Sequence, residues 1–341
     1  MLNINDYGLV PLFDDLPGIP ARVTAVHKER YEIVCAHGLS HARLKAGEYY
    51  GGEEQFPTTG DFVMINYIDN GDSQILRTLP RRTFFSRRNP GPVPYEQAVA
   101  ANFDYVFIMQ SLNQDFNPKR LERYLTLVWQ SGAVPVILLT KADLVEDDWD
   151  YITAAERVAA GVNIHTVSAL TGYGLARLNA YLQPGKTVVF LGSSGVGKSS
   201  LVNALAGEEI MTVNGIREDD AKGRHTTTHR QLIRLPSGVM VIDTPGMREL
   251  GMWEVSEGIG EAFADVERFL GKCRFRNCCH DGEPGCAVRA AIDSGELDMA
   301  RWESYRNLKE EAVDKSEMLR RKREWSKGVA KINKQRKKGT W

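Results

Sequence analysis

The stretch TVVFLGSSGVGKSSLVNALAG at residues 187–207 decides the fold of this chain. It begins with the apolar run of a buried strand and ends in SLVNALAG, which is typical of a helix. Between them, GSSGVGKS at 192–199 matches the pattern G-x-x-x-x-G-K-[ST]. Glycines let backbone N–H groups curl around phosphates, and the helix that follows directs its positive N-terminus at them. The stretch therefore predicts a phosphate-binding loop in an α/β domain.

This loop provides most of the predicted nucleotide contacts. Lys198 is expected to reach the β- and γ-phosphates and to act in catalysis, and Ser199 is expected to ligate Mg²⁺. DTPG at 243–246 follows the apolar segment VMVI, so Asp243 is expected to hold the Mg²⁺ shell and Gly246 to sense the γ-phosphate through its N–H group. The predicted contacts of the loop itself are Gly192, Ser193, Ser194, Gly195, Val196, Gly197, Lys198, Ser199 and Ser200.

Two further strand ends carry residues suited to a purine base. TKAD at 140–143 resembles the guanine-recognition pattern NKxD, with Thr140 in place of Asn, and the stem of Lys141 would cover one face of the base. Asp143 would accept hydrogen bonds from guanine N1 and N2, a pattern that adenine lacks. For TKAD alone, a helix cap at Asp143 is the alternative. Ser168 and Ala169, in SAL at 168–170, resemble the loop whose backbone contacts the guanine oxygen.

Apolar strands alternate with helices from Asn102 onward. DYVFIMQ, VPVILLT and TVVFLG are continuous apolar runs, as in parallel sheets that are covered on both faces. Residues 19–80 differ, because their short β-branched segments are separated by glycines and polar clusters, as in a small barrel or sandwich. The sequence thus predicts a multidomain protein with an N-terminal β-rich part and a central α/β part.

Four of the five cysteines lie between Cys273 and Cys286, together with His280. Such a cluster is typical of a metal site when no secretory signal is present, and neither a signal peptide nor a long apolar span is evident in the sequence. Three thiolates and one imidazole would form a closed tetrahedral zinc site of the structural type. Spacing alone does not decide whether Cys278 or Cys279 is a ligand. The expected compartment is the cytoplasm.

The charges are unevenly distributed along the chain. The net charge is −1, yet residues 320–338 contain ten Lys or Arg residues and one acid, Glu324. A basic tail on an acidic body suggests a polyanionic partner such as RNA, although a solvated surface helix is an equally good interpretation of the tail alone.

The order of the motifs is unusual. Small GTPases run from phosphate loop through the switches to NKxD and SA, whereas here TKAD and SA precede the phosphate loop and DTPG, which is a circular permutation. With GRHTTTHR at 223–230, DTPGMRELG and CRFRNCCHDGEPGCAV, the chain closely resembles the bacterial ribosome small-subunit-dependent GTPase A family, also called RsgA or YjeQ, over about residues 19–310.

This resemblance implies a set of domains and ligands. The implied domains are an OB-fold at 19–80, a circularly permuted P-loop GTPase domain at 102–255 and a mainly helical zinc-binding domain at 256–318. A linker at 81–101 is expected between the first two, because RRTFFSRRNPGPVP at 81–94 holds three prolines. The leader at 1–18 and the basic tail at 319–341 are less characteristic of the family. The implied zinc ligands are Cys273, Cys278, His280 and Cys286, with Cys279 as spacer. Thr140 departs from the commoner Asn and is expected to loosen a contact between loops, while Asp143 still reads the base.

The segment GRHTTTHR lies where switch I is expected. One of its threonines would join Mg²⁺, with Thr227 chosen among Thr226–Thr228. In Ras-type enzymes a Gln after DxxG orients the attacking water, but Met247 stands there in this chain. His225 is the nearest polar candidate for that role, and the resemblance also implies it. A solvated loop histidine is the rival interpretation.

The expected function is Mg²⁺-dependent hydrolysis of GTP to GDP and phosphate, stimulated by the small ribosomal subunit and its rRNA during late maturation of that subunit. The expected cofactors are one structural Zn²⁺ and the Mg²⁺ that accompanies GTP. We expect a monomer with no membrane partner. Two alternatives remain: a P-loop ATPase, against which Asp143 argues, and a non-catalytic RNA-binding adaptor that holds a structural nucleotide.

Overall fold

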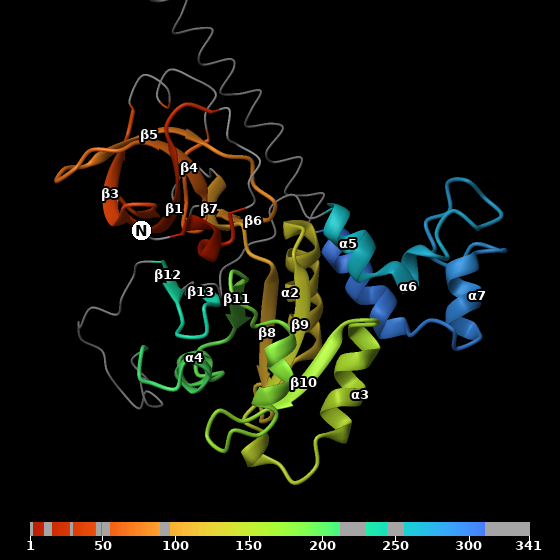
Figure 1. Ribbon diagram of the computed structural model, residues 1–341. Helices are drawn as coiled ribbons and strands as arrows, with labels where there is room; N and C mark the ends of the chain where they lie inside the picture. Colours follow the sequence, from red (N-terminus) through yellow and green to blue (C-terminus); the bar gives the residue numbers. More distant parts are fainter. Residues whose placement is uncertain are drawn as a thin grey trace, which may run out of the picture. The chain divides into compact units, whose positions relative to one another are not determined.

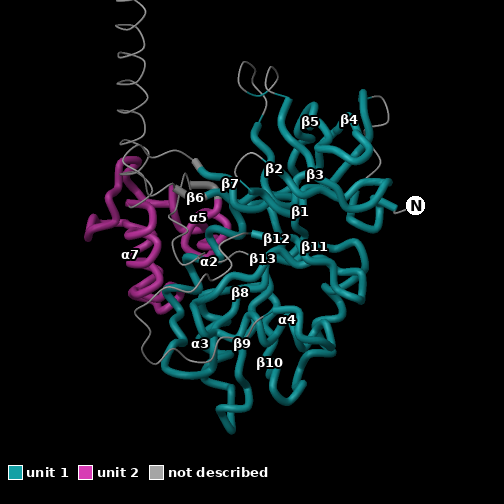
Figure 2. The backbone as a smooth tube through the Cα atoms, turned by 90° about the vertical axis from the view of Figure 1, so that its left-hand side faces the viewer, with its two compact units in different colours: residues 1–251 teal, residues 252–341 magenta. Residues whose placement is uncertain are grey.

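The computed structural model describes residues 3–9, 16–27, 30–45, 49, 55–88, 96–211, 230–243 and 256–310. The chain divides into two compact units, residues 1–251 and 252–341 (Figure 2), and each is described by itself. His225, Thr227, Gly246 and Met247 lie outside the described residues, as does the expected basic tail.

The first unit contains all the strands of the described chain (Figure 1). They are β1 (Ile19–His27), β2 (Arg30–Cys35), β3 (Gly38–Leu44), β4 (Phe62–Asn66), β5 (Ser73–Thr78), β6 (Phe84–Arg88), β7 (Glu96–Ala101), β8 (Tyr105–Ser111), β9 (Val134–Thr140), β10 (Asn163–Val167), β11 (Thr187–Gly192), β12 (Gln231–Arg234) and β13 (Met240–Asp243). Its helices are α2 (Pro118–Ser131), α3 (Trp149–Val158) and α4 (Lys198–Ala206), with the 3-10 helices η1 (Ile4–Tyr7), η2 (Ala142–Leu144) and η3 (Leu175–Ala180).

The α/β part is built on six strands in the order β10-β9-β8-β11-β13-β12. The first five run parallel to one another, and β12 is antiparallel to β13. Every residue of β11 is buried, as are the last six of β8 and of β9, because helices cover both faces of the sheet. The predicted, mainly parallel sheet is confirmed.

The helices lie on opposite faces of this sheet. α2 begins after the N-cap Asn117, whose side chain accepts from the N–H of Arg120, and it ends at Gly132 in the left-handed conformation. Leu121 and Val128 on its inner face are fully buried, as its spacing predicted. η3 and α4 share a core with alternate residues of β8 and β9, so they cover the other face. η3 is a 3-10 helix of six residues.

The N-terminal strands form a closed barrel. Five strands follow the order β1-β2-β3-β5-β4, and β1 pairs also with β4, which closes the circle. Side chains such as Val23, Ile33 and Ile75 fill the interior and are completely buried. β3 was not expected, because GLSHARL has a single buried residue, Ala42, and so lacks an apolar pattern.

Barrel and α/β part share one sheet. β1 of the barrel pairs with β12, with Ala25 opposite Gln231. Beside this seam the fully buried Arg22 donates to the carbonyls of Asn102 (2.8 Å) and Gly60 (3.1 Å), which satisfies a charge that burial would otherwise destabilise. Burial lowers the pKa of Arg22 to about 9, so the guanidinium stays charged at neutral pH.

Gly60 lies in the turn before β4. Its φ is +94°, and a Cβ there would lie 2.1 Å from the carbonyl oxygen of Ala101, so the close approach of these two segments requires glycine.

The expected linker 81–101 contains an antiparallel hairpin of β6 and β7. The hairpin is fixed to the α/β part by stacking of Phe85 on Phe103, with centroids 4.7 Å apart, and by a hydrogen bond from Thr83 Oγ1 to the Phe103 carbonyl (2.6 Å). The prolines that suggested a linker fall in the part of this segment outside the described residues.

The second unit is helical in the residues that the structure describes. It comprises α5 (Ser256–Ala262), α6 (Ala264–Glu267), α7 (Ala287–Asp293) and helical residues 299–310. Buried Arg301 joins two of these helices, because its guanidinium donates to both carboxylate oxygens of Asp265 at 3.0 Å. No helix among the described residues has the length and apolar character of a membrane span.

Candidate functional site

The predicted nucleotide-binding loops meet at one edge of the sheet. The phosphate loop follows β11, TKAD begins at the end of β9, SAL follows β10 and DTPG begins at the end of β13. Because these four strands are parallel, their carboxyl ends lie at the same edge, where α/β domains bind ligands. The fold thus brings together segments that are up to about a hundred residues apart in the chain.

The phosphate loop has the backbone that close contact with phosphates requires. Gly195 and Gly197 have φ values of +73° and +100°, which favour glycine. A Cβ on Gly192 would lie 2.9 Å from the Met109 carbonyl of β8, so the loop begins tightly against the neighbouring strand. Lys198 opens α4, and its Nζ donates to the carbonyls of Gly192 (3.1 Å) and Ser193 (3.0 Å). The ammonium group therefore lies against the loop that it is expected to serve.

Thr140 connects the guanine-type loop to the phosphate loop. Its hydroxyl is buried and donates to the carbonyl of Val196 at 2.7 Å. Threonine at this position therefore still reaches the main chain of the phosphate loop, and a contact looser than that of the commoner asparagine stays a prediction. The contact fixes the spacing between the two loops.

Asp143 and Ser168 are in direct contact. The hydroxyl of Ser168 donates to Asp143 Oδ1, while the Asp143 side chain remains exposed at the surface. Lys141, two residues before Asp143, has the left-handed conformation with φ +61°, which is uncommon for a residue with a side chain. The chain turns there, just after the end of β9, so the Asp143 carboxylate lies near the end of the strand. The structure therefore brings together the residues expected to read a guanine base.

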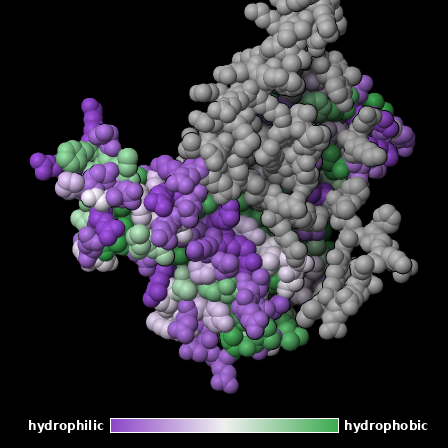
Figure 3. Space-filling view, turned by 180° about the vertical axis from the view of Figure 1, so that it is seen from behind, coloured by the Kyte–Doolittle hydropathy of each residue, from purple (hydrophilic) through white to green (hydrophobic). Residues whose placement is uncertain are grey.

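Apolar side chains lie next in sequence to the residues expected to read the base. Leu170, next to Ala169, is 83% exposed and Leu144, next to Asp143, is 58% exposed. Figure 3 shows a described surface that is mainly hydrophilic, with smaller hydrophobic patches. Exposed leucines on both loops are well suited to cover the faces of a planar base, a feature that the motif patterns did not reveal.

The expected Mg²⁺ ligands are described in part. Ser199 lies in the first turn of α4 and Asp243 at the end of β13, and both side chains are half-buried. A hydroxyl and a carboxylate are oxygen donors of the kind that Mg²⁺ prefers. Ser194 and Ser200 belong to the same loop and helix, with Ser194 exposed.

The sequence analysis missed Asp115, which contacts the phosphate loop. It lies between β8 and α2, and its carboxylate accepts a hydrogen bond from the hydroxyl of Ser193. Its position just after a buried parallel strand, at the edge where the motifs gather, is the signal that could have found it.

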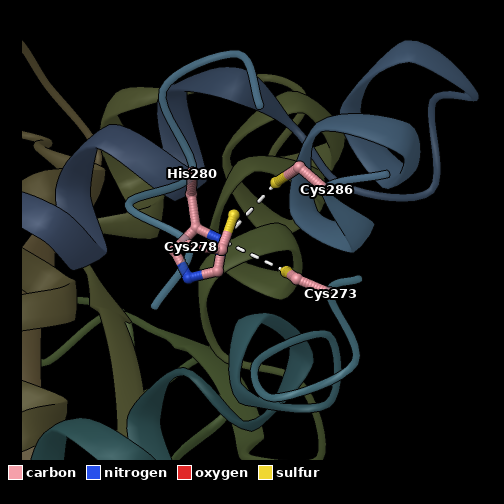
Figure 4. Close-up of side chains that lie close together, drawn as sticks. All are labelled: Cys273, Cys278, His280 and Cys286. Atoms are coloured by element: carbon pink, nitrogen blue, oxygen red, sulfur yellow. Dashed lines mark hydrogen bonds between the residues drawn. The ribbon is translucent and has the colours of Figure 1, made fainter. Parts of the chain in front are cut away.

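The second unit holds the predicted cysteine and histidine cluster (Figure 4). One ligand atom each from Cys273, Cys278, His280 and Cys286 lies within 4.8 Å of all the others. His280 presents Nδ1 to the sulfurs, 3.4 Å from Cys273 Sγ and 3.5 Å from Cys286 Sγ.

These distances fit a tetrahedral metal. Zn–S and Zn–N bonds at the tetrahedral angle place sulfur and nitrogen about 3.5 Å apart. Backbone N–H groups of Ala287 and Arg289 each lie 3.4 Å from a cysteine sulfur, Cys273 and Cys286 respectively. Burial disfavours the Cys273 thiolate, but the N–H groups of Ala287 and Val288 and the neighbouring thiols of Cys278 and Cys286 hold the pKa of Cys273 below its usual value. The cluster can hold a metal ion.

Cys279 does not belong to this cluster. Its side chain is exposed, and its sulfur lies 3.8 Å from the carbonyl oxygen of Asn277. Cys35 is the remaining cysteine, and it is fully buried in the barrel core.

Fold and site together define a P-loop GTPase with permuted motif order. Comparison with known proteins places it further. A model of the RsgA GTPase family matches residues 78–253. The chain is 47% identical over 313 residues to the small ribosomal subunit biogenesis GTPase RsgA 1 of Listeria monocytogenes, covering 90% of this chain and 89% of that protein. The chain therefore belongs to the RsgA GTPase family.

Solved structures agree with this assignment. YjeQ from Thermotoga maritima superposes with a TM-score of 0.62 at 25% identity, covering 86% of this chain and 98% of that one. YloQ, described as a circularly permuted GTPase, superposes with a TM-score of 0.61 at 27% identity, covering 87% of this chain and 95% of that one. The permutation expected from motif order, the barrel and the GTPase class are confirmed.

Proposed function

We propose that this GTPase hydrolyses GTP to GDP and phosphate in a Mg²⁺-dependent reaction that the small ribosomal subunit stimulates, late in the maturation of that subunit. One observation carries the proposal: the sheet edge assembles phosphate and guanine loops in a chain whose relatives are named small ribosomal subunit biogenesis GTPases. We also propose that the protein acts in the cytoplasm, and that it acts as a monomer.

The described residues divide the work on GTP. Asp143 accepts hydrogen bonds from the guanine base, with Lys141, Leu144 and Leu170 beside it. Lys198 places a positive charge on the β- and γ-phosphates, and backbone N–H groups of residues 193–199 surround them. Mg²⁺, held by Ser199, Asp243 and Thr227, would neutralise the charge that develops on these phosphates.

Water activation is proposed to depend on switch I. Met247 occupies the place of the water-orienting Gln of Ras-type enzymes and cannot perform that role, so His225 is proposed to position the attacking water. Gly246 is proposed to sense the γ-phosphate through its N–H group. A GTPase without its usual water-orienting group is slow alone, which agrees with a partner that completes the site.

The flanking modules are proposed to hold the subunit. Barrels of this kind bind looped or single-stranded RNA by stacking and charge, and the basic tail adds phosphate contacts. One Zn²⁺ bound by Cys273, Cys278, His280 and Cys286 would hold the second unit in shape; three thiolates and an imidazole leave no open position for chemistry.

Turnover assays with and without purified small subunits test the proposal. The subunit is expected to accelerate GTP hydrolysis strongly, and the chain is expected to co-sediment with it better in a non-hydrolysable GTP analogue than in GDP. Linkage requires that the subunit then tightens GTP binding by the same factor. Equal sedimentation in both states without acceleration would leave the adaptor alternative, and ATP competing as well as GTP would favour an ATPase.

A further inference from the structure

Asp115 is held rigidly on the side of the phosphate loop. Asn113 orders its loop, since the side-chain oxygen of Asn113 accepts from the Asp115 N–H (3.0 Å) and from the Ser111 hydroxyl (2.8 Å). The Phe116 N–H donates to the Asn113 carbonyl at 3.1 Å. The carboxylate of Asp115 thus projects from a turn whose own hydrogen bonds are satisfied.

Arg120 also holds the carboxylate of Asp115 in place. Arg120 lies in the first turn of α2, and its guanidinium donates to Asp115 Oδ1 at 3.1 Å, with 3.0 Å to Oδ2. It also donates to the main-chain carbonyl of Asp115 and to Oε1 of the fully buried Gln110, at 3.1 Å from the latter. Such a forked arrangement allows little rotation of either side chain.

The remaining hydrogen bond of the carboxylate goes to Ser193, the second residue of the phosphate loop. Burial raises the pKa of Asp115, but the hydrogen bonds from Ser193 and Arg120, with the charge of Lys141, outweigh it and hold this pKa below its usual value. Asp115 is therefore an ionised hydrogen-bond acceptor at neutral pH. The phosphate loop that it contacts contains Gly195 and Gly197 in left-handed conformations, and a loop of that kind loses entropy when a ligand orders it.

We propose that Asp115 is a positioning residue for the phosphate loop: through the Ser193 hydroxyl it holds the loop in its phosphate-binding shape before GTP arrives. Together with the Thr140 bond to Val196, it anchors the loop at its second and fifth residues. The negative charge this introduces beside an anion-binding loop is balanced by Arg120. The inference rests on the GTP binding proposed above and adds the group that pre-organises it.

Release of a fluorescent GDP analogue from the full-length protein tests this inference. Asp115→Ala and Ser193→Ala are each expected to speed release by about tenfold, the value of one charge-assisted hydrogen bond. The double variant is expected to release no faster than either single variant, because both remove the same contact. Asp115→Asn keeps an acceptor for Ser193 and loses the charge, so its release of the GDP analogue is expected to be slower than that of Asp115→Ala and faster than that of the wild type. For Asp115→Ala, KM for GTP is expected to rise more than kcat falls.

Asp72→Ala is the matched control. Asp72 also accepts from two arginines, Arg30 and Arg43, but it lies in the barrel, so its loss is expected to leave nucleotide release unchanged. If Asp115→Ala and Ser193→Ala release nucleotide like Asp72→Ala, or if their effects add in the double variant, the inference is wrong. If the wild-type protein itself does not retain guanine nucleotides, the proposed function fails instead.

Discussion

The phosphate loop and the cysteine cluster are two binding sites with different foundations. The loop follows β11, a strand buried at every residue, and is tied to its neighbours through Thr140 and Asp115. Between Lys272 and Cys286, where every residue is described, Cys286 is the only buried one. A segment with so little buried apolar surface would gain its stability from a bound metal, whereas the phosphate loop is already shaped by the protein. Ligand removal should therefore disturb the two sites very differently.

Loss of the metal is the largest effect expected. Cys278→Ala removes one of the four expected ligands. Because structural zinc contributes about 10–16 kcal/mol in small zinc modules, residues 272–286 are expected to lose both zinc and folded structure. Elemental analysis is expected to find less than about one-tenth of a zinc ion per chain. Cys279→Ala is the control and is expected to keep a full zinc ion. Full zinc in the Cys278 variant would show that the cluster is not the metal site.

Loss of the phosphate-loop lysine is expected to remove activity while leaving the fold intact. Lys198→Ala should lower GTP turnover by about 10³-fold, because the charge on the β- and γ-phosphates is no longer balanced. Thermal unfolding is expected to change little. Lys186→Ala is the control, a lysine at the opposite end of the same strand that pairs with Asp104 at 3.1 Å. A large fall in stability for Lys198→Ala alone would break the contrast between the two sites.

Specificity for the base should depend on a single carboxylate. Asp143→Asn is expected to weaken GTP binding by about a hundredfold, because the amide accepts from guanine N1 without a charge and opposes the N2 donor with its own NH2 group. The variant should prefer xanthosine triphosphate, whose exocyclic oxygen replaces the N2 donor of guanine. Competition binding measures both effects, with Asp147→Asn as control. An unchanged preference for GTP over the xanthine nucleotide would exclude Asp143 from base recognition.

The smallest expected effect concerns the shape of the phosphate loop. Thr140→Val removes the hydroxyl that donates to Val196 and should weaken GTP binding by roughly tenfold, since a buried carbonyl loses its partner. Thr126→Val is the matched control, because buried Thr126 also donates to a carbonyl, that of Glu122, but within α2 and away from the loop. Equal nucleotide affinity in the two variants would show that the loop keeps its shape without Thr140.

The sequence predicted those parts of the fold that have a local signal. β8, β9 and β11 are continuous apolar runs, and the phosphate loop is specified by residues that are adjacent in the chain. β3 escaped because Ala42 is its only buried residue, and a single buried alanine gives no periodic pattern. The hairpin of β6 and β7 escaped because the prolines between its strands dominated the interpretation.

Polar contacts over long separations could not be predicted. Arg22 resembles any surface arginine until the fold brings Asn102 and Met240 to it, 80 and 218 residues away. Asp115 likewise gains its partner Ser193 from 78 residues further on. A single sequence carries no information on such pairs, because neither residue is unusual within its own segment. Only the folded sheet brings the two partners within hydrogen-bonding distance. The positions of His225, Thr227 and Gly246 stay predictions.

The seam between β1 and β12 makes the barrel part of the architecture of the GTPase domain. β12 is the last strand of the α/β sheet, and the barrel strand pairs with its outer side. A fragment that began at Asn102 would expose the N–H and C=O groups of this strand as an open edge, which is a template for pairing with another chain. Truncated versions are thus expected to aggregate, and the domain boundary near residue 102 is unsuited to dissection by deletion.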